Sequence, residues 1–339
     1  MSVAPLLITP GDPAGIGPEI VWKTLCDPRF RKLDYELICV GARGPFEKLG
    51  ARIGEVSIRN GKLQFPPRSK APQVLIIPAP SKSSRKSEFL PGFQSGWSIA
   101  TATRLVQDGL ASALVTGPIS KERLKRGGFN FPGHTEFLAE LCGVKQVTMM
   151  LANETLRISL VTTHLALKDV PKALTRENIT QTVLHTYWHL KNWWGIKNPR
   201  IAIAALNPHA GESGLFGTEE IRLITPVIKA LREKLKDTQL IGPLPADTLF
   251  AKHIMASKKD RFDAVVCMYH DQGLIPVKLV DFPHTVNITL GLPIVRTSVD
   301  HGVGFDIVGK RIADPSSLQA AILLAAHIVK KQTKERLSA

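Results

Sequence analysis

The amino-acid sequence predicts an α/β protein in which helices cover a mostly parallel β-sheet. Three observations lead to this fold class: short β-branched and apolar runs recur along the chain, helical patterns separate them, and turn residues mark the junctions. The chain has 339 residues, of which 44% are hydrophobic and 22% charged, as is typical of a globular protein. Because one domain takes roughly 100–200 residues, we expect two domains, or two lobes that share one sheet.

The predicted elements alternate along the chain. Apolar runs predict strands at 6–9, 35–40, 74–77, 113–116, 147–151, 157–163, 200–206, 264–268 and 285–289. Helical patterns predict helices at 18–26, 97–109, 121–126, 135–141, 176–194, 218–236 and 315–331. Gly127-Gly128 is expected to end the third helix in a left-handed turn, Thr135 to cap the fourth, and Asp314-Pro315 to open the last. The Pro-, Ser- and Lys-rich stretch 66–92 is predicted to be a mobile excursion that encloses one strand.

The charge of the chain is its one unusual compositional feature. There are 44 Lys and Arg residues against 29 Asp and Glu residues, which gives a formal charge of +15. A nucleic-acid-binding protein concentrates such charge in a patch or tail. Here the basic residues form short scattered clusters at 82–86, 121–126, 258–261 and 330–336. We interpret most of them as solvated surface, and the sharper alternative is a small anionic substrate.

The cysteine pattern and the lack of long apolar segments predict a cytoplasmic protein. The four cysteines are far apart and form no Cys-x-x-Cys pair, which favours reduced thiols over disulfides or a thiolate zinc site. The longest apolar run, 320–329, is shorter than the ~18 residues that a membrane-spanning helix needs. The N-terminal residues lack the basic segment of a signal peptide. The short apolar segments lead us to expect no membrane partner, and the scattered basic charge leads us to expect no nucleic-acid partner.

Three histidines, His164, His209 and His270, each stand at or just beyond the end of a predicted strand. Because the carboxyl ends of parallel strands meet at one edge of a sheet, these imidazoles can converge there, and a few neutral nitrogen ligands suit a divalent cation. The alternative is that they are ordinary surface or core residues, as a single histidine usually is. Asp271 and Asp247 are candidate acceptors for fixing the imidazole tautomers.

The segment between the first strand and the first helix is rich in glycine. Gly11, Gly15 and Gly17 permit tight turns, and the N-terminus of a helix attracts anions. The pattern is not the dinucleotide-binding fingerprint, because Ile20 stands where the third glycine belongs and Gly41 ends the next strand without an acidic residue. The chain also has neither a P-loop nor a G-x-S-x-G elbow, which disfavours a P-loop kinase and a serine hydrolase.

Candidate anion anchors occur late in the chain. Lys278, Asn287 and Arg296 follow one another through a stretch predicted to be rich in strand. Lysine supplies a point charge, and arginine a fork that holds a carboxylate or phosphate with two hydrogen bonds. His134 and Thr135 add an imidazole, a hydroxyl and a helix N-terminus. Singly each is more often a surface residue, but together with a metal they suit a small phosphorylated or carboxylated substrate.

Several segments of the chain, in order and over nearly its whole length, resemble those of one family. They are GDPAGIGPEI (11–20), TGPISK (116–121), GHTEFLAEL (133–141), NPHAGESGLFG (207–217), MYHDQGL (268–274), VNITLGLPIVRTSVDHG (286–302) and ADP (313–315). The family is that of 4-hydroxythreonine-4-phosphate dehydrogenase, an enzyme of pyridoxal phosphate biosynthesis. GHTEFL and MYHDQGL are specific to it.

The resemblance implies a homodimer of the isocitrate/isopropylmalate dehydrogenase-like fold with the active site at the subunit interface. Each chain is expected to form two α/β/α lobes, 1–136 plus 297–339 and 137–296, with the active-site cleft between them. The implied reaction is the NAD- or NADP-dependent oxidation of 4-(phosphooxy)-L-threonine to 2-amino-3-oxo-4-(phosphooxy)butanoate. That product loses carbon dioxide to give 3-amino-2-oxopropyl phosphate, in the biosynthesis of pyridoxine 5'-phosphate.

The resemblance also assigns roles to residues of this chain. The implied metal ligands, shared between subunits, are His164, His209 and His270, with zinc, cobalt or magnesium as the metal. The implied substrate contacts are His134, Thr135, Lys278, Asn287 and Arg296. Asp247 and Lys278 are the candidates for taking the hydroxyl proton, and the cofactor-binding residues stay unassigned.

Two single positions and one link depart from the family's usual pattern. Ser213 replaces a common glycine, Val303 replaces a threonine, and the link 281–285 lacks a glycine. Two alternative functions remain open. A paralogue that oxidises 4-phosphothreonate or 4-phosphoerythronate would keep the histidines and the anion anchors. A phosphate acyltransferase of the same fold type would not need the three histidines.

Overall fold

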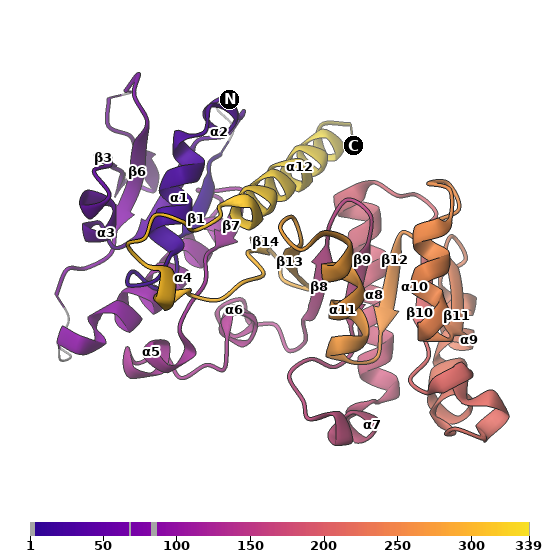
Figure 1. Cartoon of the computed structure of the whole chain (residues 1–339). Coiled ribbons are helices and arrows are strands. Elements are labelled where there is room, and N and C mark those ends of the chain that lie inside the picture. Colours follow the sequence, from indigo (N-terminus) through magenta and orange to yellow (C-terminus); the bar gives the residue numbers. More distant parts are fainter. Residues whose placement is uncertain (1–3, 68, 83–86, 339) are drawn as a thin grey trace. The chain divides into compact units, whose positions relative to one another are not determined.

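The computed structural model describes residues 4–67, 69–82 and 87–338, and Figure 1 traces them in sequence order. The chain forms two compact units, and the strands of both belong to one 12-stranded sheet, as the prediction of lobes that share a sheet requires. Unit 1 comprises residues 1–145 and 292–330, and unit 2 comprises residues 146–291 and 331–339. The divisions lie nine and five residues from the predicted lobe boundaries, and residues 331–339 fall in unit 2. The shifts arise because helix α6 (His134–Leu141) packs against α4 (Leu90–Gln107), and strand β14 (Val295–Ser298) pairs with β7 (Ala113–Thr116). Arg296 therefore belongs to unit 1.

Unit 1 contributes a part of this sheet in which neighbouring strands run parallel. Its strands lie in the order β14-β7-β1-β2-β6-β3 and pair in parallel throughout. Besides β7 and β14 these are β1 (Leu6–Thr9), β2 (Leu37–Gly41), β3 (Arg52–Glu55) and β6 (Gln73–Pro78), and β4 (Ser57–Arg59) with β5 (Lys62–Gln64) forms a separate hairpin. The other helical segments are α1 (Gly17–Cys26), α2 (Pro28–Arg31), α3 (Gly44–Lys48), η1 (Ser87–Phe89), α5 (Lys121–Arg126), η5 (Phe305–Ile307) and α12 (Ser316–Ser338), which begins in this unit. The central strands are completely buried, as their continuous apolar runs require.

Unit 2 contributes a mixed part of the sheet in the order β11-β10-β12-β9-β8-β13. Strands β11 (Gln239–Leu244), β10 (Arg200–Ala204), β12 (Ala264–Cys267) and β9 (Arg157–Leu160) run parallel, whereas β8 (Thr148–Ala152) is antiparallel to both β9 and β13 (Val286–Leu290). Its helical segments are η2 (Leu167–Asp169), α7 (Val170–Ala173), α8 (Arg176–Trp194), η3 (Pro208–Gly214), the π-helix η4 (Glu220–Ile224), α9 (Thr225–Lys234), α10 (Ala246–Met255) and α11 (His270–Asp281).

The two faces of strand β9 are covered by different helices. Ile158 and Leu160 pack in one core cluster with Leu274 of α11, whereas Ser159, which points the opposite way, accepts a hydrogen bond from Thr186 of α8 at 2.7 Å. Gly273 allows α11 to lie close to the strand, since a Cβ at this position would come within 2.5 Å of Ile158. Helix α11 is thereby held against the face of β9 that carries Ile158 and Leu160.

Several sequence predictions need correction. Thr135 does not cap a helix: α6 begins at His134, and its N-cap position is Gly133. Helix α4 begins at Leu90, so the stretch 66–92 includes its first turn besides β6. Lys278 lies on a helix, not in a strand-rich stretch. The prediction missed the elements β3, β4, β5, β11, β14, α2, α3, α7, α10 and α11.

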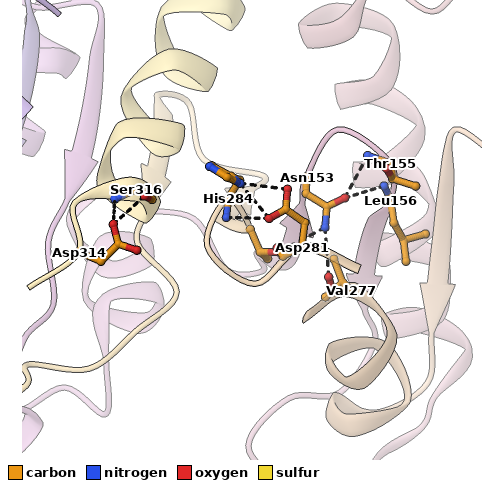
Figure 2. Close-up of polar contacts among 9 residues, drawn as sticks. Asn153, Thr155, Leu156, Val277, Asp281, His284, Asp314 and Ser316 are labelled. Carbon is orange, nitrogen blue, oxygen red and sulfur yellow. Dashed lines mark hydrogen bonds and ion pairs between the residues drawn. The ribbon is translucent and has the colours of Figure 1, made fainter. Parts of the chain in front are cut away.

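Two predicted helix ends are confirmed. Gly128, after α5, has a left-handed φ of +100°. Asp314 opens α12, because its Oδ1 accepts hydrogen bonds from the backbone N–H of Ser316 at 2.9 Å and from the Ser316 hydroxyl at 2.6 Å (Figure 2). Most of the basic cluster 82–86 lies outside the described residues. Among the helices of the described residues, none has the length and hydropathy needed to cross a membrane.

Candidate active site

The strands that precede the three histidines are neighbours in unit 2. Strand β12 lies between β9 and β10, and all of them run parallel, so their carboxyl ends share one edge. Pairing continues beyond the ladder, because Thr162 donates from its hydroxyl to the carbonyl of Met268 at 2.7 Å. The segments that lead to His164 and to His270 are thus tied together.

His164 and His270 lie side by side. Their ring centroids are 5.5 Å apart, with 44° between the ring planes. The Nδ1 atom of His270 is 2.7 Å from Oδ1 of Asp271. This contact favours the tautomer with the proton on Nδ1, which leaves Nε2 of His270 available as a metal ligand.

His209 lies in an unusual stretch of backbone. From His209 to Ser213, five consecutive residues have φ between +40° and +79°, which is the left-handed helical region. Only one of them is glycine, and each of the others costs roughly 1–2 kcal/mol in this conformation. Within the described part of the chain, no group of three or more His, Cys, Asp or Glu side chains is placed to hold a metal ion, so a single chain does not gather the three histidines around one ion.

The pair formed by His164 and His270 nevertheless fits part of a metal site. Two imidazoles at this separation, one of them held by a carboxylate, are the neutral nitrogen donors that zinc and cobalt accept. A further ligand is needed to complete the set. The assignment of all three histidines to one metal thus stays a prediction.

Unit 2 also carries Lys278, Asn287 and Asp247. Lys278 is half-buried on α11, further along the helix from His270, with its Nζ atom 5.3 Å from the centroid of the Phe282 ring. Asn287 is half-buried on β13. Asp247 is exposed in the first turn of α10, the helix that packs against η3 and therefore against the segment of His209.

A buried amide connects the segments that bear Lys278 and Asn287. Figure 2 shows the side chain of Asn153 between the β8–β9 turn and the end of α11. Its Nδ2 donates to the carbonyl of Val277 at 3.1 Å and to the Thr285 hydroxyl at 3.3 Å. Its Oδ1 accepts from the backbone N–H groups of Thr155 and Leu156 at 3.0 and 2.9 Å.

Arg296 is a buried charged residue of unit 1. It is 2% exposed on β14, and its Nη2 and Nε donate to the hydroxyl oxygen of Thr116 at 2.7 and 3.2 Å. That hydroxyl donates to Ser298 Oγ at 3.0 Å, and the Ser298 hydroxyl donates to the Thr116 carbonyl at 3.0 Å. Burial lowers the pKa of Arg296 to about 9, so the guanidinium still carries its charge at neutral pH.

His134 is a half-buried, neutral imidazole near Arg296. Burial lowers the pKa of His134 well below its ordinary value, and the positive charge of Arg296 lowers it further. Its Nε2 atom is buried and has no hydrogen-bond partner among the described residues. Thr135 follows it in the first turn of α6 and is half-buried. A neutral nitrogen next to a buried cation can bond a substrate oxygen without adding a second charge.

The glycine-rich loop is explained by close backbone packing. A Cβ on Gly11 would collide with the carbonyl of Pro118, and a Cβ on Gly17 with the carbonyl of Pro10. In the same loop Asp12 is 1% exposed and lies 3.5 Å from Nη1 of Arg123. Burial raises the pKa of Asp12, although a hydrogen bond from the backbone N–H of Ala14 opposes the shift.

Sequence reasoning missed four residues that hold the candidate site residues in place: Thr116, Asn153, Glu220 and Ser298. Two of them, Thr116 and Ser298, lie within segments that the family resemblance rests on, and this was the one available signal. Asn153 and Glu220 lie outside those segments. Their roles depend on partners far away in the sequence or on a local backbone conformation, neither of which a motif displays.

Comparison with known proteins shows the family. The family model described as "Pyridoxal phosphate biosynthetic protein PdxA" matches residues 68–325. A relative from Caulobacter vibrioides named 4-hydroxythreonine-4-phosphate dehydrogenase is 47% identical over 98% of this chain and 99% of its own. A relative from Bradyrhizobium diazoefficiens, named "Putative D-threonate 4-phosphate dehydrogenase", is 43% identical over 95% of this chain and 96% of its own.

Solved structures agree. The crystal structure of 4-hydroxythreonine-4-phosphate dehydrogenase from Klebsiella pneumoniae has a TM-score of 0.82 and 35% identity, covering 96% of this chain and 99% of that one. Isocitrate dehydrogenase from Methylococcus capsulatus, at 12% identity and a TM-score of 0.51 over 98% of this chain and 88% of its own, shares the fold alone. The predicted α/β fold of the isocitrate dehydrogenase type is therefore confirmed. On this sequence and structural similarity, the chain belongs to the family of the pyridoxal phosphate biosynthetic protein PdxA.

Proposed function

We propose that this protein oxidises 4-(phosphooxy)-L-threonine with NAD or NADP to 2-amino-3-oxo-4-(phosphooxy)butanoate, which decarboxylates to 3-amino-2-oxopropyl phosphate in pyridoxine 5'-phosphate biosynthesis. Relatives named for this dehydrogenase, at 44%, 47% and 46% identity over nearly the whole chain, support the activity. The structural observation that carries the proposal is the pair formed by His164 and His270 at the ends of adjacent parallel strands.

The proposed site uses the three histidines for a divalent cation shared between subunits. When bound, such a cation lowers the pKa of the substrate hydroxyl and stabilises negative charge on its oxygen, while the nicotinamide accepts the hydride. Asp271 keeps the ring of His270 oriented through the contact at Nδ1. Zinc and cobalt suit imidazole nitrogen better than magnesium does.

The anion anchors are proposed to orient the substrate. Arg296, Lys278 and Asn287 hold the phosphate and carboxylate, so that C3 presents its hydrogen to the cofactor. Neutral His134, with its buried Nε2, and Thr135 complete the contacts to substrate oxygens. For the proton that leaves the hydroxyl we propose Lys278 or Asp247 as the acceptor. The variants Lys278→Met and Asp247→Asn distinguish the two candidates, because replacing the true base should remove the rise of the rate with pH that depends on its deprotonation.

The histidine edge also supports a homodimer with the active site at the subunit interface. Large apolar side chains are exposed shortly after each histidine: Leu167 at 70%, Leu215 at 73% and Leu279 at 85%. Exposed large apolar side chains are typical of a surface that another protein covers. A second copy of the chain that covers these segments would bury them. Sedimentation of wild-type protein and of Leu279→Asp tests this, and a wild-type monomer at micromolar concentration would contradict it.

The thiols support a cytoplasmic location. All four cysteines are free, and Cys39 and Cys267 are buried, which raises the pKa of each thiol and makes it unreactive. Free thiols of this kind persist in a reducing compartment. Labelling of the native protein with a thiol reagent should modify the exposed Cys26 and spare these two.

A second candidate substrate is favoured by one specific observation. The relative named for D-threonate 4-phosphate is nearly as similar to this chain as those named for 4-hydroxythreonine-4-phosphate. The two substrates share the phosphate, the carboxylate and the oxidised hydroxyl, and differ where one carries an amino group. The anion anchors therefore suit both.

The test is reduced-cofactor formation from 4-(phosphooxy)-L-threonine, 4-phosphothreonate and 4-phosphoerythronate, each with NAD and with NADP, before and after chelation. The highest kcat/KM is expected for the first compound, with loss of activity in chelator and in His209→Ala. Full activity in the variant would disprove the three-histidine assignment. A higher kcat/KM for 4-phosphothreonate would show that this protein is the paralogue that oxidises that compound.

A further inference from the structure

The left-handed turn that carries His209 needs something to hold it. His209, Ala210, Glu212 and Ser213 all have the backbone conformation that side chains disfavour, and His209 is exposed. A free loop of this composition would relax to ordinary turn conformations. The strain therefore has to be balanced by contacts at the ends of the turn.

A single buried carboxylate makes those contacts at the start of the turn. Glu220 is 2% exposed, and its Oε1 accepts the backbone N–H groups of Leu206 and Asn207 at 2.8 Å each. Its Oε2 accepts the side-chain amide of Asn207 at 2.9 Å. These residues link the end of β10 to His209. The carboxylate thus fixes the direction in which the chain leaves the sheet, two residues before the imidazole.

Two glycines near Glu220 allow the backbone of the turn to lie close to the Glu220 and Asn207 side chains. A Cβ on Gly211 would come within 2.8 Å of Glu220 Oε2, and a Cβ on Gly217 would collide with the side-chain amide of Asn207. Glu220 itself begins a π-helix, a rare local distortion that is frequent at functional sites. The turn, the two glycines and the carboxylate form one interlocked unit.

We propose that Glu220 is a positioning residue for His209, holding the turn so that the imidazole is presented as a metal ligand. This inference rests on the proposed function, in which His209 binds the metal. It assigns to Glu220 the task that the carboxylate of Asp271 performs directly for His270, but exerted through the backbone. The contacts require the reach of the side chain more than its charge, because its partners are three N–H donors of neutral groups.

Two variants separate reach from charge. Glu220→Gln keeps the length of the side chain and an oxygen that accepts the backbone amides of Leu206 and Asn207, but replaces the acceptor of the Asn207 side-chain amide by an NH2 group. Glu220→Asp keeps the charge but withdraws the carboxylate by one methylene. The matched control is Glu19→Ala, which removes another buried carboxylate that holds a backbone N–H, that of Ala313 at 3.0 Å, in unit 1.

The full-length apoprotein is titrated with Co²⁺, and binding is measured from the visible ligand-field absorption of the bound ion. Hydrogen exchange of the Leu206 and Asn207 backbone amides and urea unfolding are measured on the same variants. Glu220→Asp should weaken Co²⁺ binding roughly 10–100-fold and speed exchange of both amides. Glu220→Gln, which keeps the two backbone contacts, should weaken Co²⁺ binding less than Glu220→Asp does. Glu19→Ala should lose stability with unchanged Co²⁺ affinity. His209→Ala should lose the wild-type absorption spectrum.

The outcomes distinguish this proposal from the function on which it rests. If His209→Ala binds Co²⁺ like the wild type, the metal assignment is wrong, and the role of Glu220 falls with it. If His209→Ala loses binding but Glu220→Asp does not, only the positioning role is wrong. A Gln variant weaker than the Asp variant would show that charge matters and not reach. If Glu220→Asp and Glu19→Ala weaken Co²⁺ binding equally, Glu220 contributes only to the overall stability of the fold and does not position His209.

Discussion

Replacing Thr116 by valine removes the hydroxyl that holds Arg296 and leaves the shape of the side chain nearly unchanged. The hydroxyl oxygen accepts from Nη2 and Nε of a guanidinium that is 2% exposed. A hydrogen bond to a charged group contributes about 1.5–3 kcal/mol, and we count the two contacts as one because they share an acceptor atom. Thr116→Val should therefore lower the free energy of unfolding by about 1.5–3 kcal/mol.

Thr103→Val is the matched control. Thr103 is also fully buried, belongs to the same unit, and donates its hydroxyl to the carbonyl of Ile99 at 2.7 Å. Its loss removes a bond between neutral groups, which is expected to cost about 0.5–1.5 kcal/mol. Urea unfolding of both variants, followed by a probe in unit 1, compares the two substitutions within one unfolding transition.

The kinetic consequence follows from the proposed role of Arg296. A guanidinium that is no longer held by Thr116 should bind the substrate anion less well, which raises KM more than it lowers kcat. Thr103→Val should leave KM unchanged. Equal losses of stability in the two variants, together with an unchanged KM in Thr116→Val, would refute the idea that Thr116 positions the arginine.

Three further predictions concern unit 2. Ser213→Gly should raise the free energy of unfolding by about 1 kcal/mol in urea, because Ser213 has a φ of +54° and glycine avoids the strain; a loss of stability would contradict the left-handed turn. Asn153→Ala should cost about 2–5 kcal/mol of unfolding free energy, since four hydrogen bonds are lost from a buried amide, and a change near zero would contradict the contacts in Figure 2. Burial lowers the pKa of His189 from 6.5 to about 3. Between these two pH values the unfolded state binds a proton that the folded state does not, so lowering the pH reduces the free energy of unfolding by up to about 1.4 kcal/mol per pH unit. His189→Gln should reduce the pH dependence of unfolding in that window and leave it unchanged above pH ~7; parallel curves for the two proteins would show that His189 is not buried neutral.

The sequence was informative where a feature depends on neighbouring residues. The buried parallel strands are continuous apolar runs, so the ends that deliver His164, His209 and His270 could be located before any coordinates. Helix α11 was missed because Gly273 and Pro276 interrupt its pattern. The glycine is there for packing against Ile158, which only the fold reveals. Strand β14 was missed because its short run includes Arg296, whose burial depends on the distant Thr116.

The backbone of the 209–213 turn could not be predicted at all. Its five residues include one glycine, Gly211, and no local pattern in the sequence predicts five left-handed residues in succession. The conformation is imposed by Glu220, which belongs to a π-helix that is itself an exception to regular hydrogen bonding. Features that arise from a balance between strain and tertiary contacts leave no periodic signal.

The way in which the chain passes through its two units has a consequence for synthesis. Unit 2 is essentially one continuous segment inserted into unit 1, whose sheet needs β14 from beyond the insertion to pair with β7. As the chain leaves the ribosome, residues 146–291 are complete while unit 1 still lacks strand β14 and helix α12. Because domains generally fold as units during translation, the inserted unit is expected to reach its native structure first. Until β14 is made, β7 has no partner on that side, and an unpaired strand edge is a template for pairing with another chain.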